Sequence, residues 1–175
     1  PSDAKPEYAG KFVITYDASP WGFGITLATD GKLTDYMHGS WDKATLTRFN
    51  ARIGDCAFQS LWEHLAGLMA MCAFAPSNQA FTVRGDNLGA LNNALKLKGK
   101  NHSLLVAKEI AWRTAAYRWR PVYAHIQGTR NVVCDDLSRL QAPTPHAWPS
   151  SLNSCKGHNA LKLESLWNLG HCAAE

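Results

Sequence analysis

The run of residues 56–75, CAFQSLWEHLAGLMAMCAFA, limits the folds open to this chain more than any other segment. It is rich in helix-forming residues and ends before Pro76, so we expect one long helix. One face carries large apolar side chains and the opposite face mostly small ones, with Glu63 as the only formally charged residue. This pattern predicts a helix that is packed on both sides, and therefore a layered fold.

Segments before and after this helix carry strand patterns. Residues 12–17, 22–29 and 32–41 predict three successive strands, with a hairpin turn at Asp30 and Gly31. The later segments predict a strand over 80–86, helices over 87–96 and 103–119, a strand over 121–126 and a helix over 131–141. This order predicts an α/β fold with a five-stranded mixed sheet, three antiparallel strands followed by two parallel ones, flanked by helices.

The composition changes near residue 142. We expect an N-terminal connection over 1–10, the main domain over 11–142, and a tail over 143–175. The tail begins with the Pro- and Ser-rich PTPHAWPSS, typical of a linker, and continues into a short amphipathic helix candidate over 159–169. The hydrophobic fraction of 46% is enough for one well-buried domain.

The net charge, the cysteines and the hydrophobic segments limit the partners and the cellular compartment that we expect for the protein. A net charge of +4 permits a polyanionic partner without requiring one. The five cysteines are odd in number and widely spaced, which predicts reduced thiols in the cytoplasm or nucleus. Neither a secretory leader nor an apolar run near 18 residues is found, so we expect an intracellular protein that is not secreted and has no membrane span.

Acidic residues stand where predicted strands end. Asp17 and Asp86 each close a strand, and polar sites gather at the carboxyl ends of parallel strands. A buried Glu63 near them would suffer like-charge repulsion unless a cation lay among the carboxylates, and Mg²⁺ suits such oxygen ligands. Each residue also has an ordinary interpretation: Asp17 as a turn residue, Asp86 as a helix N-cap, and Glu63 as a solubilising charge at an open edge.

The segment YAHIQGTRNVVCDDLSR, residues 123–139, adds a more specific pattern. Together with the order of Asp17, Glu63 and Asp86, it resembles the ribonuclease H domain of reverse transcriptases, especially those of retrotransposons. The family's closing motif has His, Gly three residues on, Asn six on and Asp ten on, which are His125, Gly128, Asn131 and Asp135 here. The resemblance covers roughly residues 11–141.

The resemblance implies a ribonuclease H-like fold and a metal-dependent reaction. Asp17, Glu63, Asp86 and Asp135 would bind two Mg²⁺ ions, with Mn²⁺ able to substitute, and His125 would transfer a proton or help product leave. The family cuts the RNA strand of an RNA–DNA hybrid, leaving 3′-hydroxyl and 5′-phosphate ends, next to an attached polymerase domain. Asp136 falls one position late for the motif, so we expect it to be a dispensable charge at the helix start.

The resemblance also suggests contacts to the hybrid. Gln59 and Ser60 fall where the family places polar side chains against the minor groove, in which the RNA 2′-hydroxyls are displayed. Further candidates are Ser19 and Asn87 and a short basic segment that contains Lys96, Lys98, Lys100 and His102. These lysines would contact phosphates, or would simply form a solvated loop.

Other functions remain open at this point. A DNA-processing nuclease or integrase of the same fold is one alternative, although integrases place the glutamate last and Glu63 comes second here. A silent ribonuclease H-like scaffold of a polymerase polyprotein is another. Independently of these alternatives, His125 could be an ordinary histidine with its hydrogen bonds satisfied at a strand end. The tail residues Cys155, His158, His171 and Cys172 suggest zinc, but adjacent His171 and Cys172 are poor partners for one tetrahedral ion.

Overall fold

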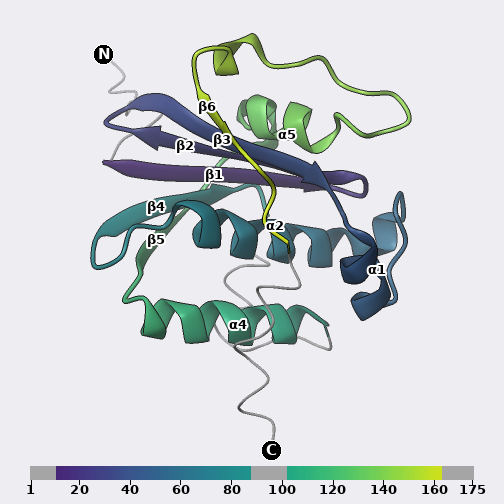
Figure 1. Cartoon of the computed structure of the whole chain (residues 1–175), viewed down its shortest axis with the longest axis horizontal. Coiled ribbons are helices and arrows are strands. Elements are labelled where there is room, and N and C mark those ends of the chain that lie inside the picture. Colours follow the sequence, from purple (N-terminus) through teal and green to yellow (C-terminus); the bar gives the residue numbers. More distant parts are fainter. Residues whose placement is uncertain (1–10, 88–101, 163–175) are drawn as a thin grey trace, which may run out of the picture.

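A computed structural model of the chain describes residues 11–87 and 102–162 (Figure 1). Its centre is a six-stranded sheet in the order β5-β4-β1-β2-β3-β6. The strands are β1 (Phe12–Ser19), β2 (Gly22–Thr29), β3 (Lys32–Ser40), β4 (Ala80–Gly85), β5 (Arg120–His125) and β6 (Lys156–His158). Neighbours β1/β2 and β2/β3 are antiparallel, whereas β1/β4, β4/β5 and β3/β6 are parallel.

Helices cover both faces of this sheet. They are α1 (Lys43–Phe49), α2 (Gln59–Phe74), α4 (His102–Ala116) and α5 (Val132–Ser138), with single 3₁₀ turns at Cys56–Phe58, Gly128–Arg130 and Ser150–Leu152. Helix α2 lies between the sheet and α4, and α5 lies on the opposite side of the sheet (Figure 1). The predicted mixed α/β architecture is therefore confirmed.

The hairpin between β2 and β3 follows from two residues. Asp30 and Gly31 have φ angles of 49° and 79°, so both adopt the left-handed backbone that a tight two-residue hairpin requires. Aspartate and glycine tolerate this conformation better than most residues, and the predicted turn is confirmed. The antiparallel half of the sheet is thus determined locally.

Helix α2 is buried on both sides, as its residue pattern predicted. Every residue from Leu61 to Met71 is buried, and Trp62 stacks on Trp41, with ring centroids 4.8 Å apart. Glu63 lies within this stretch with only 3% of its surface exposed. The alternative of a glutamate at an open edge is therefore excluded.

Helix α5 packs closely against β2 because of one glycine. A Cβ at Gly24 would lie 2.3 Å from the carbonyl oxygen of Cys134 and 2.5 Å from the Cβ of Leu137. Only a residue without a side chain allows the helix to approach this far. This contact fixes the height of α5, and thus of Asp135, above the sheet.

The prediction of five strands was wrong, because the chain after residue 142 adds a sixth. Strand β6 pairs with Asp35–Met37 of β3. The same segment buries Leu152 to 1% exposure and sets Trp148 edge-on against Tyr36, with ring centroids 5.3 Å apart. The tail, whose first part over 143–151 was expected to be a linker, thus packs on the sheet through Leu152 and residues 156–158.

Other differences are local. Helix α1 was not predicted; Asp42 caps it by accepting a hydrogen bond from the N–H of Thr45 at 2.7 Å. The helix expected over 87–96 lies outside the described residues except for Asn87, and so does most of the one expected over 159–169, whose described part is not helical. Within the described ranges no helix is long and apolar enough to cross a membrane.

Candidate metal centre

Three carboxylates meet at one end of the sheet. In the parallel pair β1/β4, Thr15 lies opposite Arg84, so Asp17 and Asp86, each two residues further along, come side by side. Glu63, in the second turn of α2, completes the group. Ligand oxygens of Asp17, Glu63 and Asp86 all lie within 4.8 Å of one another. The expectation that Asp17 and Asp86 lie together is confirmed, but Asp17 lies within β1, which continues to Ser19, and does not close the strand as predicted.

Burial makes this group electrostatically unfavourable without a cation. Asp17 and Glu63 are only 4% and 3% exposed, whereas Asp86 is exposed. Burial, with repulsion from Asp17 and Asp86, raises the pKa of Glu63 from 4.5 to about 9. Burial, with repulsion from Asp86 and Asp135, raises the pKa of Asp17 from 3.8 to about 7. A divalent ion would favour the charged forms of both carboxyls.

The hydrogen bonds of Glu63 leave one oxygen open. Gln59 donates from Nε2 to the carbonyl oxygen of Ala18 and to Oε1 of Glu63, both at 2.8 Å. The other oxygen, Oε2 of Glu63, is buried and has no hydrogen-bond partner among the described residues. A buried carboxylate oxygen without a donor is costly in a protein that holds nothing there. It is an appropriate ligand atom for a hard cation, so the residues present fit a metal ion.

Asp17 is held from α5. Asn131, just before the helix, has Nδ2 3.4 Å from Oδ1 of Asp17 and donates to the carbonyl oxygen of Tyr16 at 3.0 Å. Ser138, the last residue of the helix, has Oγ 3.2 Å from Oδ2 of Asp17. Both ends of α5 therefore hold this carboxylate, while lone pairs on each oxygen remain for another ligand.

Asp135 is close to this group but is not one of the three. Its Oδ1 accepts a hydrogen bond from Nε of Arg139 at 2.6 Å, and its Oδ2 lies 3.8 Å from Nδ1 of His146. Asp135, Asp136 and His146 form a second group with ligand atoms within 4.8 Å of one another. The structure thus places the fourth predicted carboxylate beside Asp17, where it contributes to the raised pKa, but holds it through Arg139.

The loop after β5 approaches Asp86. His125 ends β5 opposite Gly85, the residue before Asp86, and its side chain is exposed. A Cβ built at Gly128 would lie 3.7 Å from Oδ2 of Asp86. The loop that carries the His–Gly–Asn spacing therefore runs beside the carboxylates, with Asn131 buried.

The predicted substrate contacts divide into several cases. Ser19 is fully buried, and its hydroxyl donates to the carbonyl oxygen of Ser138 at 2.6 Å, so it joins β1 to α5. Gln59 uses its amide N–H groups within the site, whereas Ser60 is exposed beside it. Asn87 is half-buried next to Asp86. The three lysine candidates lie outside the described residues: Lys96, Lys98 and Lys100.

The described tail residues that suggested zinc contact β3 instead. His158 lies with Nε2 2.7 Å from Oδ1 of Asp35, and the thiol of Cys155 donates to the carbonyl oxygen of Leu33 at 3.5 Å. Neither belongs to a group of metal-binding side chains within the described ranges. His171 and Cys172 lie outside the described residues.

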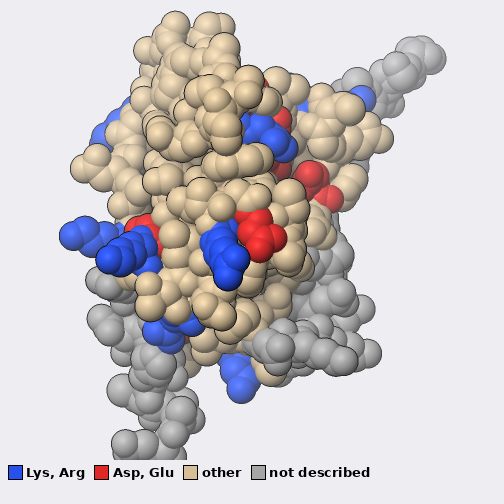
Figure 2. Space-filling model, turned by 90° about the vertical axis from the view of Figure 1, so that its right-hand side faces the viewer, with Lys and Arg blue, Asp and Glu red and all other residues tan. Residues whose placement is uncertain are grey.

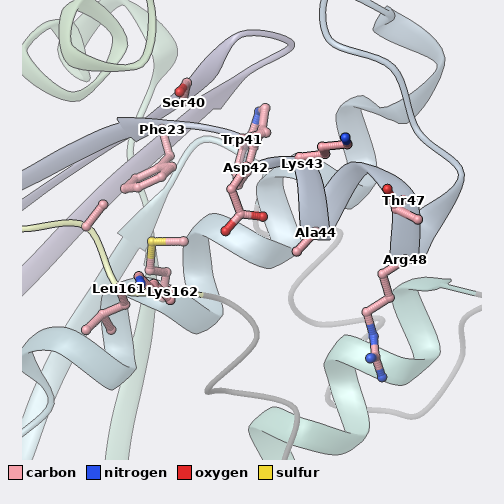
Figure 3. Close-up of a pocket in the computed structure, with 12 residues that line it drawn as sticks. Phe23, Ser40, Trp41, Asp42, Lys43, Ala44, Thr47, Arg48, Leu161 and Lys162 are labelled. Carbon is pink, nitrogen blue, oxygen red and sulfur yellow. The ribbon is translucent and has the colours of Figure 1, made fainter.

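A separate cavity of about 910 Å³ opens between α1, the end of β3 and residues 160–162 (Figure 3). Phe23, Trp41 and Leu161 form much of its apolar wall, and Asp42 contributes a carboxylate. Neither the three clustered carboxylates nor His125 line it. The candidate metal centre and this cavity are therefore different places.

Sequence reasoning missed three residues around the carboxylates. The first is Arg139, whose ion pair with Asp135 could have been predicted because the two residues are four apart on a predicted helix. Ser138 belongs to the segment 123–139 quoted above, but nothing in that pattern indicated its contact with Asp17, which spans 121 residues. His146 had none either, since it lies in the segment expected to be a linker.

Comparison with models of protein families finds no match, and comparison with curated proteins finds none of significance.

Proposed function

We propose that this protein is a metal-dependent endonuclease that hydrolyses the RNA strand of RNA–DNA hybrids, as part of a reverse transcriptase. The observation that carries the proposal is the convergence of Asp17, Glu63 and Asp86. Two of these carboxylates are buried, and Oε2 of Glu63 has no hydrogen-bond partner in the part of the chain that the structure describes. Their order along the chain, followed by the His125–Asp135 spacing, supports a ribonuclease H-like fold. The six-stranded mixed sheet is compatible with that fold.

The residues of the site fall into those that would bind the ions and those that orient the ligands. Asp17, Glu63, Asp86 and Asp135 would hold divalent ions, with Mg²⁺ the natural choice and Mn²⁺ a substitute. Such ions, when bound, activate a water and stabilise the leaving oxygen of a phosphodiester. Gln59, Asn131 and Ser138 orient the carboxylates through the hydrogen bonds described above.

Proton transfer is assigned to His125. Its exposed side chain stands at the end of β5, opposite the residue that precedes Asp86. A histidine in such a position can accept or deliver a proton near neutral pH. The products expected are a 3′-hydroxyl and a 5′-phosphate.

The surface is consistent with modest affinity for a polyanion. Figure 2 views the end of the molecule that carries α1, where basic side chains are dispersed among acidic ones and form no single patch. Lys43, Arg48 and Arg52 are exposed on α1 and the turn that follows it. We therefore expect salt-sensitive binding, with an attached polymerase domain supplying much of the affinity.

Cleavage of an end-labelled RNA–DNA hybrid with Mg²⁺ tests the proposal. We expect Asp17→Asn and Asp135→Asn to abolish cutting, because Asp135 lies near enough to Asp17 to contribute to its raised pKa. Asp136→Asn should retain most of the cutting, because Asp136 is hydrogen-bonded to His146 at 2.9 Å and falls one position late for the motif. Full activity in Asp135→Asn would refute the site assignment.

The substrate is tested separately. Equal cutting of double-stranded DNA would favour a DNA-processing nuclease of the same fold. Absence of cutting in the wild type, tested with its polymerase domain attached, would favour a silent scaffold.

A further inference from the structure

Ser138 connects two parts of the candidate metal centre. It is the last residue of α5 and is 1% exposed. Its hydroxyl oxygen lies 3.2 Å from Oδ2 of Asp17 and 2.9 Å from the carbonyl oxygen of Asp135. Its own carbonyl oxygen accepts a hydrogen bond from the hydroxyl of Ser19 at 2.6 Å. Ser138 therefore contacts β1 twice, once through its side chain and once through its backbone.

Local helix chemistry explains only part of this arrangement. A serine near a helix end often bonds back to a carbonyl three or four residues earlier, which accounts for the contact with Asp135. It does not account for the contact with Asp17, which lies 121 residues away in the sequence.

From this geometry we infer that Ser138 is a positioning residue of the metal centre, which fixes the Asp17 carboxylate relative to the helical turn that carries Asp135. The inference rests on the proposed function, since it assigns these carboxylates to divalent ions. It concerns a residue that touches a ligand and does not itself bind the metal.

The physical basis is the number of acceptor sites on a carboxylate. An ionised aspartate offers about four lone-pair sites. Asn131 approaches one oxygen of Asp17 and Ser138 the other, so the plane of the carboxylate is fixed while the remaining lone pairs stay open. Groups that orient a metal ligand in this way typically change metal affinity by about 10- to 100-fold when removed.

Direct ion binding tests this role without relying on catalysis. We would titrate the full metal-free chain with Mn²⁺, following binding by calorimetry and by the electron paramagnetic resonance of free Mn²⁺, and would record melting with and without the ion. Ser138→Ala is expected to bind Mn²⁺ about 10-fold more weakly or worse. Ser138→Cys keeps the shape of the side chain but offers only a weak donor, so its Mn²⁺ affinity should lie between those of the wild type and Ser138→Ala.

Thr26→Val is the matched control. The Thr26 hydroxyl is also buried and lies 3.5 Å from the thiol of Cys134, on the same helix, but neither atom is a carboxylate. This variant removes a contact between the sheet and α5 without touching Asp17. We expect its melting temperature to fall while its Mn²⁺ affinity stays within about 2-fold of the wild type.

The outcomes separate the two proposals. Wild-type affinity in Ser138→Ala, alongside measurable binding by the wild type, would overturn the role of Ser138 and leave the metal centre standing. An equal loss of affinity in Thr26→Val would also overturn it, because seating of α5 alone would then explain the effect. If the wild type itself bound no ion, the metal centre would be refuted, and the inference with it.

Discussion

Replacing Glu63 by glutamine should stabilise the metal-free protein. Glu63 is buried, with one oxygen hydrogen-bonded to Gln59 and the other without a partner among the described residues. A glutamine keeps an acceptor for Gln59 and places an N–H₂ group near the oxygens of Asp17 and Asp86, which lie within 4.8 Å of the Glu63 carboxylate. It also removes an ionisable group from a site where ionisation is unfavourable.

The magnitude follows from the pKa of Glu63, which folding raises from 4.5 to about 9 through burial and the neighbouring carboxylates. At pH 7 the unfolded chain has lost this proton while the folded, metal-free protein keeps it. Because the pKa of Glu63 is raised on folding, the free energy of unfolding is unaffected by this group below pH 4.5. It decreases as the pH rises from 4.5 toward 9. At about 1.4 kcal/mol per pH unit, the free energy of unfolding of the wild type is lower by about 3 kcal/mol at pH 7 than at pH 4.5.

Urea denaturation in EDTA, followed by tryptophan fluorescence at pH 5, 7 and 8.5, measures this effect. Glu63→Gln should match the wild type near pH 5 to within about 1 kcal/mol and exceed it by about 3 kcal/mol at pH 7, with a larger gain at pH 8.5. Added Mg²⁺ should narrow or reverse the difference, because the ion binds only the folded wild type well.

Glu109→Gln is the contrasting control. Glu109 is also 3% exposed, but it forms an ion pair with Arg113 at 2.8 Å on the same helix. Removing one partner of a buried pair destabilises a protein, so this variant should lose stability. If Glu63→Gln were no more stable than the wild type at pH 8.5, with a parallel dependence on pH, the electrostatic argument for the site would be wrong.

Two further predictions concern the elements that surround the site. Gly24→Ala should displace α5, because its Cβ would lie 2.3 Å from the carbonyl oxygen of Cys134. We expect the free energy of unfolding, measured by urea denaturation, to fall by about 2 kcal/mol or more, and the affinity for Mn²⁺ to fall as well. Unchanged Mn²⁺ affinity would contradict the role of this contact. Leu152→Ala should cost about 2–5 kcal/mol of the free energy of unfolding, because Leu152 lies in the tail and is 1% exposed. A cost below about 0.5 kcal/mol would show that residues 143–162 contribute little to the fold.

The sequence predicts most of the sheet and the centre of the site because those features depend on local pattern. The short apolar strand segments, the Asp30–Gly31 turn and the apolar run around Glu63 are all encoded over short distances. The meeting of Asp17 and Asp86 follows from a general property of parallel strands. No remote contact had to be known for these inferences.

What the sequence does not predict depends on contacts between distant segments. Strand β6 has the sequence Lys-Gly-His, with no apolar alternation, and forms only because β3 offers free backbone groups beside it. The ion pair between Asp135 and Arg139 could be predicted from their spacing of four residues. The sequence did not predict that Asp135 would lie outside the group formed by the other three carboxylates. The contact of His146 with Asp136 depends on the path of the tail.

The pairing of β6 with β3 also bears on self-association. An uncovered edge strand exposes N–H and C=O groups to which a strand of another molecule can add. Strand β6 occupies the middle of the β3 edge, at Asp35–Met37, and carries the exposed, charged Lys156. A shortened protein that ended near residue 142 would leave this edge open, so we would expect it to aggregate more readily even if its cluster of carboxylates were intact.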